Sequence, residues 1–345
     1  MALPAPFTPF DIRWDAPQLP DAALHDVWSS FEWWYFDLST DDGVELVVVF
    51  SRKNPIFSAD GVSVYVEYTA PGTAFKHIRN YARGEYAYSE SPGVRELRIA
   101  GNRVRIVGAD ASSMHYEVSL DLPWITGTLQ MTPQHRGFLP SADGHYFTGR
   151  NDESVYTAVS FSAPIMETTG TLTVDGKARA VSGRGYHDHP WGTQQLFWTH
   201  REWHWGRTTT PSLGVMFATV TPAGEFDGTL TFLWSGATGV FEPQVTSALT
   251  VAPSQWKRDA ITGIDFPHQL GVSVPGLAWT AQYQRSLLDT PMYERSAVSW
   301  TPVPPVETGS GWTEYFSLAP LFRWPAFLGA KVAAFFWRSF PWFGR

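Results

Sequence analysis

The sequence predicts an all-β protein built from two related antiparallel β-barrels or sandwiches, with a short amphipathic helix at the C-terminus. Three observations predict this fold class. Apolar and polar residues alternate with period two through most of the chain, as in half-buried antiparallel strands. Turn-forming pairs separate these segments, and helical periodicity is nearly absent before residue 319. A Glu-Trp-x-aromatic segment occurs twice, at 32–35 and at 202–205.

The alternation is clearest at 62–68, at 103–106 and at 115–120, where every second residue is apolar. Asp-Gly and Gly-Asn pairs lie between the expected strands and supply the positive φ angles of two-residue hairpins. They are Asp42-Gly43, Asp60-Gly61, Gly101-Asn102, Asp143-Gly144, Asp175-Gly176 and Asp227-Gly228. Many short strands joined by such turns favour a sandwich or a closed barrel.

The two copies of the Glu-Trp-x-aromatic segment lie 170 residues apart, about half of the 345-residue chain. Each copy precedes a turn-rich stretch and a hydrophobic strand, at 44–50 and at 213–220. This placement favours an internal duplication. We therefore expect an N-terminal domain at 1–165, a C-terminal domain at 166–318 and a separate tail at 319–345.

Composition excludes several classes of function. The net charge of −8 argues against a nucleic-acid partner, and the absence of cysteine excludes disulfides and thiol catalysis. The sequence contains no nucleophile elbow, phosphate-binding loop or dinucleotide fingerprint. The Pro-rich N-terminus has no signal-peptide pattern, and no apolar run reaches the ~18–20 residues that span a bilayer. A cytoplasmic protein is the simplest expectation.

The tail at 319–345 is basic and aromatic. Arg323, Lys331, Arg338 and Arg345 are spaced 8, 7 and 7 residues apart, which places them on one stripe of a helix. Such a helix suits peripheral contact with an anionic membrane on its inner surface. Docking of this helix on the mouth of a barrel is the alternative.

The densest group of reactive side chains lies at 183–192, in the segment Gly-Arg-Gly-Tyr-His-Asp-His-Pro-Trp-Gly. Strand alternation would place Tyr186 and Asp188 on one face and His187 and His189 on the other. Metal binding by the histidines lacks a third ligand at a diagnostic spacing. Acid catalysis by a carboxyl group buried among aromatic rings, and a polar network that only pins the strand, are the other interpretations.

Glu32 precedes three aromatic residues in a strand that is apolar on both faces. A carboxyl group there must be paired, protonated or solvated. One interpretation is a structural ion pair, with Arg184 or Arg201 as the partner. The other is a second acid in a pocket, although the repeat of this glutamate at Glu202 favours a structural role.

Three segments, at 32–37, 185–192 and 288–293, resemble the bacterial carotenoid 1,2-hydratases, also called hydroxyneurosporene synthases. These hydratases belong to a superfamily of two lipocalin-like domains that includes AttH-like proteins and Diels–Alderase-type cyclases. The first two segments are typical of the superfamily and the third of the hydratases. The resemblance implies two tandem lipocalin-like barrels and cofactor-free addition of water to a terminal isoprenoid double bond, without a metal.

The resemblance also implies roles for particular residues. The family's His-x-Trp corresponds to His189 and Trp191, and we expect Asp188 to donate the proton or to orient His189, with His187 beside them. The expected residues around a hydrophobic polyene or isoprenoid are Glu32, Trp33, Trp34, Tyr35, Tyr186, Trp203, Trp205 and Phe217.

One segment departs from the family's pattern. The hydratases carry a tyrosine and an aspartate on the strand after the His-x-Trp motif. The corresponding strand here is 213–219, where Phe217 and Ala218 or Thr219 take those places. A drier pocket would let a carbocation or a folded polyene close a ring, so a cyclase or isomerase is the alternative. A non-enzymatic lipid or isoprenoid carrier and a structural protein of the membrane surface remain open as well.

Overall fold

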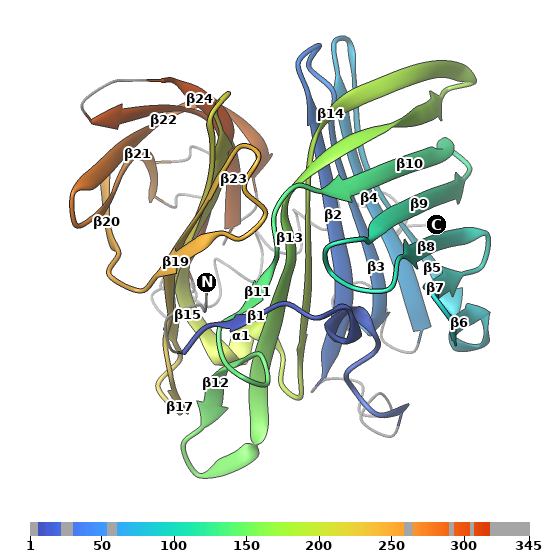
Figure 1. The fold of residues 1–345 in the computed structure, drawn as a ribbon, viewed down its shortest axis with the longest axis horizontal. Coiled ribbons are helices and arrows are strands. Elements are labelled where there is room, and N and C mark those ends of the chain that lie inside the picture. The colour runs from blue at the N-terminus through green and yellow to red at the C-terminus, as the bar shows by residue number, and fades with distance from the viewer. Residues whose placement is uncertain are drawn as a thin grey trace. The chain divides into compact units, whose positions relative to one another are not determined.

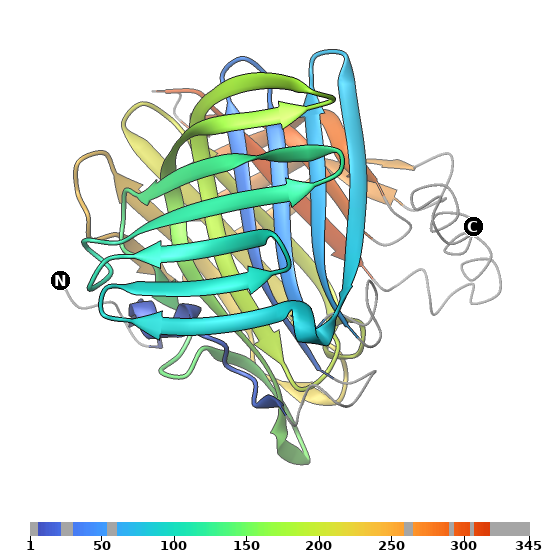
Figure 2. The same cartoon turned by 90° about the vertical axis from the view of Figure 1, so that its right-hand side faces the viewer.

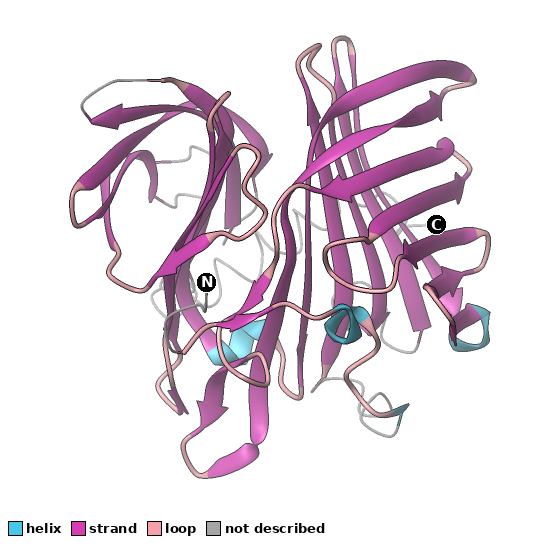
Figure 3. Ribbon diagram, viewed as in Figure 1, coloured by secondary structure: helices cyan, strands magenta, loops and turns pink. Residues whose placement is uncertain are grey.

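The computed structural model describes residues 6–21, 30–53, 61–258, 265–289, 293–303 and 307–317. Strands make up most of these residues, which confirms the predicted all-β class (Figure 3). The expected helix at 319–345 and the centre of the segment at 288–293 lie outside the described residues. Among the described helices, none has the length and apolarity needed to cross a membrane.

The chain divides into two compact units. The first comprises Met1–Tyr146 and Glu153–Gln195, and the second comprises Phe147–Asp152 and Leu196–Arg345. The boundary that we expected at 165/166 falls inside a single continuous strand of the first unit, β13 (Asp152–Val174). As a result, the whole 183–192 segment belongs to the first unit.

The first unit is a strongly curved antiparallel sheet that forms a nearly closed barrel. Its elements are β1 (Thr8–Pro9), η1 (Ile12–Asp15), β2 (Phe31–Thr40), β3 (Glu45–Lys53), β4 (Gly61–Ala70), β5 (Thr73–Ala82), η3 (Arg83–Glu85), β6 (Tyr86–Ser91), β7 (Val94–Ile99), β8 (Asn102–Val107), β9 (His115–Leu122), β10 (Ile125–Pro133), β11 (Phe138–Leu139), β13 and β14 (Lys177–Gly192). Strand β12 (His145–Gly149) begins in this unit and passes into the second unit at Phe147. The strand order is β5-β4-β3-β2-β14-β13-β10-β9-β8-β7-β6 (Figure 1). Figure 2 shows β6 to β10 lying across β2 to β5.

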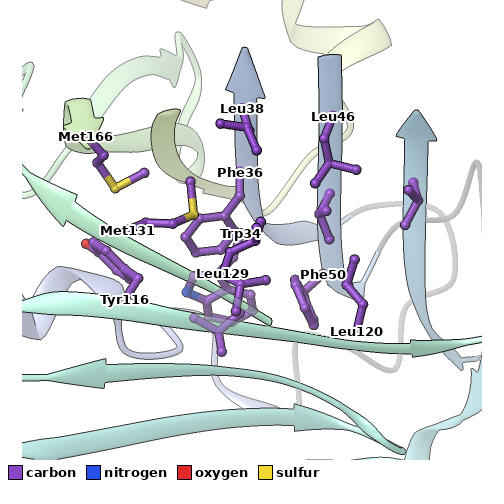
Figure 4. Close-up of a cluster of buried hydrophobic side chains, with 14 of the residues drawn as sticks. Trp34, Phe36, Leu38, Leu46, Phe50, Tyr116, Leu120, Leu129, Met131 and Met166 are labelled. Carbon is purple, nitrogen blue, oxygen red and sulfur yellow. The ribbon is translucent and has the colours of Figure 1, made fainter. Parts of the chain in front are cut away.

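The interior of the first barrel is a packed hydrophobic core. Strand β9 shows the predicted alternation, with Tyr116, Val118 and Leu120 buried. These side chains meet Trp34 and Phe36 of β2 and their neighbours from β3, β10 and β13 (Figure 4). The even-numbered residues of β2 therefore face the core, and the odd-numbered residues face the outside of the barrel.

Strand β4 differs from the expectation of a half-buried strand, because its second face is buried as well. Ser63, Tyr65 and Glu67 on that face are at most 8% exposed. The outer face of β4 is thus polar but buried rather than solvated.

The predicted turn at Asp175-Gly176 joins β13 to β14 as a two-residue hairpin. Both residues have positive φ, at 49° and 74°, and Val174 pairs with Lys177 across the turn. This is the geometry that a type I′ turn requires. The hairpin fixes the register of β14, which carries the 183–192 segment.

The second unit is an antiparallel sheet in the order β19-β18-β16-β15-β24-β23-β22-β21-β20, curved into a half-barrel. Its elements are α1 (Leu196–Thr199), β15 (His200–Thr209), β16 (Leu213–Pro222), β17 (Phe226–Asp227), β18 (Leu230–Ala237), β19 (Gln244–Thr246), β20 (Thr250–Arg258), β21 (Asp265–Val274), β22 (Leu277–Asp289), β23 (Tyr293–Val303) and β24 (Gly309–Ser317). Its core contains Phe217, Trp279 and Trp300.

The two sheets share one connectivity. In the first unit β2 pairs with β3 on one side and with the last strand, β14, on the other. In the second unit β15 pairs in the same way with β16 and with the last strand that the structure describes, β24. The two Glu-Trp-x-aromatic segments therefore lie on equivalent strands, β2 and β15, as a duplication requires.

Candidate active site

Strand β14 displays the 183–192 segment on both faces of the first sheet. It lies between β2 and β13, with Tyr186 opposite Asp37, His187 opposite Phe36 and Asp188 opposite Tyr35. The same register resumes at Trp191, opposite Glu32, so Pro190 leaves the alternation intact. The register shifts instead occur in β13, between Ser160 and Met166.

His187 points into the barrel and is fully buried. Its Nδ1 lies 2.8 Å from the carbonyl oxygen of Tyr35, and its Nε2 lies 3.2 Å from Oδ1 of Asp15. The ring stacks on Phe36 with 4.0 Å between the centroids and 3° between the planes. These contacts fix the imidazole on every side.

His189 repeats this arrangement two residues further along β14. Its Nδ1 lies 2.7 Å from the carbonyl oxygen of Trp14, and its Nε2 lies 3.2 Å from Oε1 of Glu32. The ring stacks on Trp34 with 4.4 Å between the centroids. Trp191 lies next along the same face, with its ring 5.2 Å from that of His189.

The hydrogen-bond pattern determines where the ring protons lie. A carbonyl oxygen can only accept a hydrogen bond, so Nδ1 of each histidine carries hydrogen. Nε2 then faces a carboxylate oxygen, and this contact is favourable only when a proton lies between the two atoms. We therefore describe Asp15–His187 and Glu32–His189 as two buried pairs that each share one proton.

Glu32 also forms a buried ion pair with Arg52. Nη1 of Arg52 donates to Oε2 at 2.9 Å, and the backbone amide of Gln18 donates to Oε1 at 2.5 Å. Burial alone would raise the pKa of Glu32, but the hydrogen bond and charge of His189, followed by Arg52, bring it below its usual value. The expected partners were wrong: Arg184 instead pairs with Glu167, and Arg52 takes the place expected for Arg184 or Arg201.

Asp15 belongs to the N-terminal segment, whose η1 helix docks on the first barrel. Its carboxylate accepts hydrogen bonds from the hydroxyls of Tyr116 and Ser162, each at 2.5 Å. Burial raises the pKa of Asp15, but the charge and hydrogen bond of His187, with smaller effects of His189 and Ser162, lower it overall. Residues 11–21 thus supply one carboxylate and the carbonyl of Trp14 to the buried pairs.

The opposite face of β14 carries a different group. The hydroxyl of Tyr186 donates to Oδ2 of Asp188 at 2.6 Å, and the Tyr35 ring lies 5.9 Å from that of Tyr186 in an edge contact. Burial, and then the negative charge of Asp188, raise the pKa of Tyr186 well above its usual range, so its hydroxyl keeps its proton. Asp37 lies opposite Tyr186 on β2.

Beyond the apolar Val47 and Val49 of β3, the same face of β4 carries another tyrosine and carboxylate, and the hydroxyl of Tyr65 donates to Glu67. We call Tyr35, Asp37, Tyr65, Glu67, Tyr186 and Asp188 the acidic face. It comprises three tyrosines and three carboxylates on β14, β2 and β4, with β3 between the last two.

The predicted catalytic residues therefore lie on opposite faces of the first sheet, and the two sets differ in solvent exposure. His187 and His189 are 0% exposed and Trp191 is 2% exposed, and all three face the barrel interior. Asp188, Tyr35 and Trp33 are half-buried on the outer face. The carboxylate that orients His189 is Glu32, so the expectation that Asp188 could do so was wrong.

The other predicted lining residues are divided between the two units. Trp34 belongs to the core of the first barrel and Phe217 to that of the second unit, where both are packed on all sides. Trp203 and Trp205 lie on β15, on the face that corresponds to the acidic face. Glu202, the repeat of Glu32, is paired with His204 and is 37% exposed in its side chain, so the two glutamates are not equivalent.

Sequence reasoning missed Asp15, Asp37, Arg52 and Glu67. Asp15 and Arg52 belong to no recognisable motif. They lie far from the 183–192 segment in the sequence and approach it only in the folded protein. Asp37 did carry a signal, since it lies on the repeated strand two residues beyond Tyr35.

Fold and site together describe a two-unit, lipocalin-like β protein with an array of acidic and aromatic groups on its first sheet. No protein-family model matches the chain. In sequence it is 24% identical over 314 residues to the protein named hydroxyneurosporene dehydrogenase of Chlorobaculum tepidum, covering 78% of this chain and 77% of that protein. It is 28% identical to the quinolone epoxide rearrangement protein penF of Penicillium thymicola, covering 62% of each.

Solved structures have the same fold. An AttH-like protein of Nitrosomonas europaea superposes with a TM-score of 0.59 at 17% identity, covering 88% of this chain and 98% of that one. CghA gives a TM-score of 0.62 at 14% identity, covering 84% and 88%. Kievitone hydratase of Nectria haematococca gives 0.52 at 13% identity, covering 92% and 98%. The resemblance to the lipocalin-like superfamily of AttH-like proteins and carotenoid hydratases is thereby confirmed.

Proposed function

We propose that this protein is an enzyme that protonates a carbon–carbon double bond of a hydrophobic polyene or isoprenoid, after which water captures the carbocation. The observation that carries the proposal is the half-buried Asp188, held by the Tyr186 hydroxyl beside the ring of Tyr35. A relative named for hydroxyneurosporene, a carotenoid, supports the substrate class.

Asp188 is the proton donor in this proposal. The Tyr186 hydroxyl donates to Oδ2, and in this proposal Oδ1 carries the proton toward the substrate. Asp37 and Glu67 lie on the same face, and nearby like charges disfavour ionisation of every carboxyl group at once. The proposal assigns the proton that such repulsion would retain to Asp188.

The reaction follows from this geometry. Asp188 gives its proton to the less substituted alkene carbon, and the π electrons of the double bond form the new C–H bond. The tertiary cation lies against the rings of Tyr35 and Trp33, each contributing ~0.5–2 kcal/mol of stabilisation. Water adds to the cation, and the resulting oxonium returns a proton to the Asp188 carboxylate.

The buried pairs position this acid without touching the substrate. His187 and His189 flank Asp188 in the chain. They fix β14 against β2 through Glu32 and the carbonyl of Tyr35, and against the N-terminal segment through Asp15 and the carbonyl of Trp14. A group held on a rigid strand keeps the geometry that proton transfer needs.

Ring closure or rearrangement of a similar substrate is the second candidate. The relative penF is named for rearrangement of a quinolone epoxide, which supports this candidate. The same acid would then generate a cation that a second double bond, rather than water, captures. Simple binding without turnover is the third candidate.

Incubation with acyclic carotenoids such as lycopene and neurosporene, followed by mass spectrometry, separates these candidates. A product heavier by one water supports hydration, and an isomer of unchanged mass supports cyclisation. Asp188→Asn should lower turnover by about 10²–10⁴-fold while binding persists. Asp42→Asn, at an exposed ion pair with Arg179, is the matched control. Full activity of Asp188→Asn would refute Asp188 as the donor.

A further inference from the structure

The internal duplication gives each unit a glutamate–histidine pair at corresponding places in its sheet. Glu32 on β2 pairs with His189 on β14. Glu202, on the equivalent strand β15, pairs instead with His204 of its own strand. Tyr315 on β24 lies opposite His204 and takes the place that His189 has on β14. The histidine has therefore moved to the neighbouring strand, while its contact with the glutamate is kept.

Peptide backbone and a cation close the pair of the first unit. The carbonyl of Trp14 accepts from Nδ1 of His189, and the backbone amide of Gln18 donates to Glu32. Arg52 of β3 binds the second oxygen of this carboxylate. Both side chains of the pair are 0% exposed.

The pair of the second unit lacks these partners within the described ranges. Nε2 of His204 lies 3.4 Å from Oε1 of Glu202, but Nδ1 of His204 is buried without a hydrogen-bond partner. Strand β16, which corresponds to β3, contains no Lys or Arg, whereas Tyr315 and Arg201 act on Glu202 by a hydrogen bond and by charge. The Glu202 side chain is 37% exposed. This pair is therefore open, and its unpaired ring nitrogen is costly to bury.

The duplication leaves the second unit without a preceding segment that could close its pair. Strand β14 belongs to the first sheet, and the chain passes from it through α1 into β15. At the other end of the unit, the described part of β24 ends at Ser317, which lies opposite Glu202 in the register. The residues that follow Ser317 therefore begin beside the open pair.

These residues resemble the N-terminal segment in sequence. The dipeptide Arg-Trp occurs twice in the chain, as Arg13-Trp14 and as Arg323-Trp324. Each copy follows an apolar residue, and each has one Ala and one Pro among the next three residues. The chain beyond residue 317 contains no Asp or Glu. It can therefore bring a cation to the open pair without a competing acid.

We propose that residues 318–325 close the Glu202–His204 pair, as the N-terminal segment closes the pair of the first unit. The carbonyl of Trp324 accepts from Nδ1 of His204, and Arg323 binds Glu202. This placement gives the buried nitrogen a partner and the carboxylate a charge-assisted donor. Because the segment is covalently attached beside the pair, its effective concentration there is high.

Limited proteolysis of the full chain by trypsin tests this contact, because Arg323 is itself a cleavage site. Wild type should be cleaved after Arg323 about tenfold or more slowly than a synthetic peptide of residues 318–330. Glu202→Gln and His204→Leu should each raise the cleavage rate of the full chain by about tenfold. The matched control is Asp227→Asn, at an exposed ion pair with Arg150 in the same unit, which should leave the rate unchanged.

Circular dichroism checks that each variant is folded. If His204→Leu does not fold, Glu202→Gln still decides, because that side chain is partly exposed. Cleavage of wild type at the rate of the free peptide, or equal rates in wild type and Glu202→Gln, overturns the proposal. Protection that appears only with phosphatidylglycerol vesicles would assign the segment to a membrane surface, and protection that grows with protein concentration would assign it to a second copy of the chain. Either result also overturns the proposal, and none of these outcomes depends on activity at Asp188.

Discussion

Glu32 holds His189 from one side while a backbone carbonyl holds it from the other. Oε1 of Glu32 lies 3.2 Å from Nε2, and the carbonyl of Trp14 accepts from Nδ1 at 2.7 Å. Arg52 binds the second oxygen of the same carboxylate. One buried side chain therefore connects the N-terminal segment, β3 and β14.

Replacing Glu32 with Gln should destabilise the first unit by about 3–5 kcal/mol, because it leaves two buried cationic partners without their anion. Chemical denaturation followed by tryptophan fluorescence measures this loss. Glu167→Gln removes an exposed pair with Arg184 and should cost less than about 1 kcal/mol. Similar losses for both variants would show that the buried pairs do not contribute to stability.

Acid should unfold the first unit through Asp15 and Glu32. Both have pKa values below their ordinary values of 3.8 and 4.5 in the folded state. As the pH falls below these ordinary values, the unfolded chain binds protons first, so stability is lost with falling pH. The free energy of unfolding of Asp15→Asn, measured between pH 6 and about pH 3, should fall less steeply than that of wild type. An unchanged slope would contradict the assignment.

His200 should give the second unit a separate sensitivity at higher pH. Burial lowers its pKa from 6.5 to about 3, so the folded state keeps the ring neutral. Below pH 6.5 the unfolded chain takes up a proton that the folded chain does not, and stability falls by ~1.4 kcal/mol per pH unit. His200→Gln should remove this slope between pH 6.5 and 5, whereas His115→Gln, at a partly exposed site on β9, should retain it.

The period-two alternation of strand residues predicted the placement of the site residues better than the family motifs did. Alternation correctly separated Tyr186 and Asp188 from His187 and His189, because β14 keeps its register through Pro190. It could not supply Asp15, which is 172 residues away from His187 and reaches it only when the N-terminal segment docks on the barrel. The internal repeat identified the equivalent strands, but we recognised it only as far as Tyr35 and Trp205. The charged residues two positions further on, Asp37 and Arg207, were therefore not predicted.

The hydrogen bond from Tyr186 to Asp188 should have two opposing effects on catalysis. It fixes the carboxyl group, so Tyr186→Phe should lower the plateau of kcat at low pH by about tenfold with little change in KM. The hydroxyl also stabilises the ionised carboxylate, so its loss should move the alkaline decline of the rate to higher pH. Tyr88→Phe is the matched control, because Tyr88 donates to Glu90 with the same two-residue spacing at an exposed site. A uniform loss of rate at every pH would mean that Tyr186 supports the fold rather than the acid.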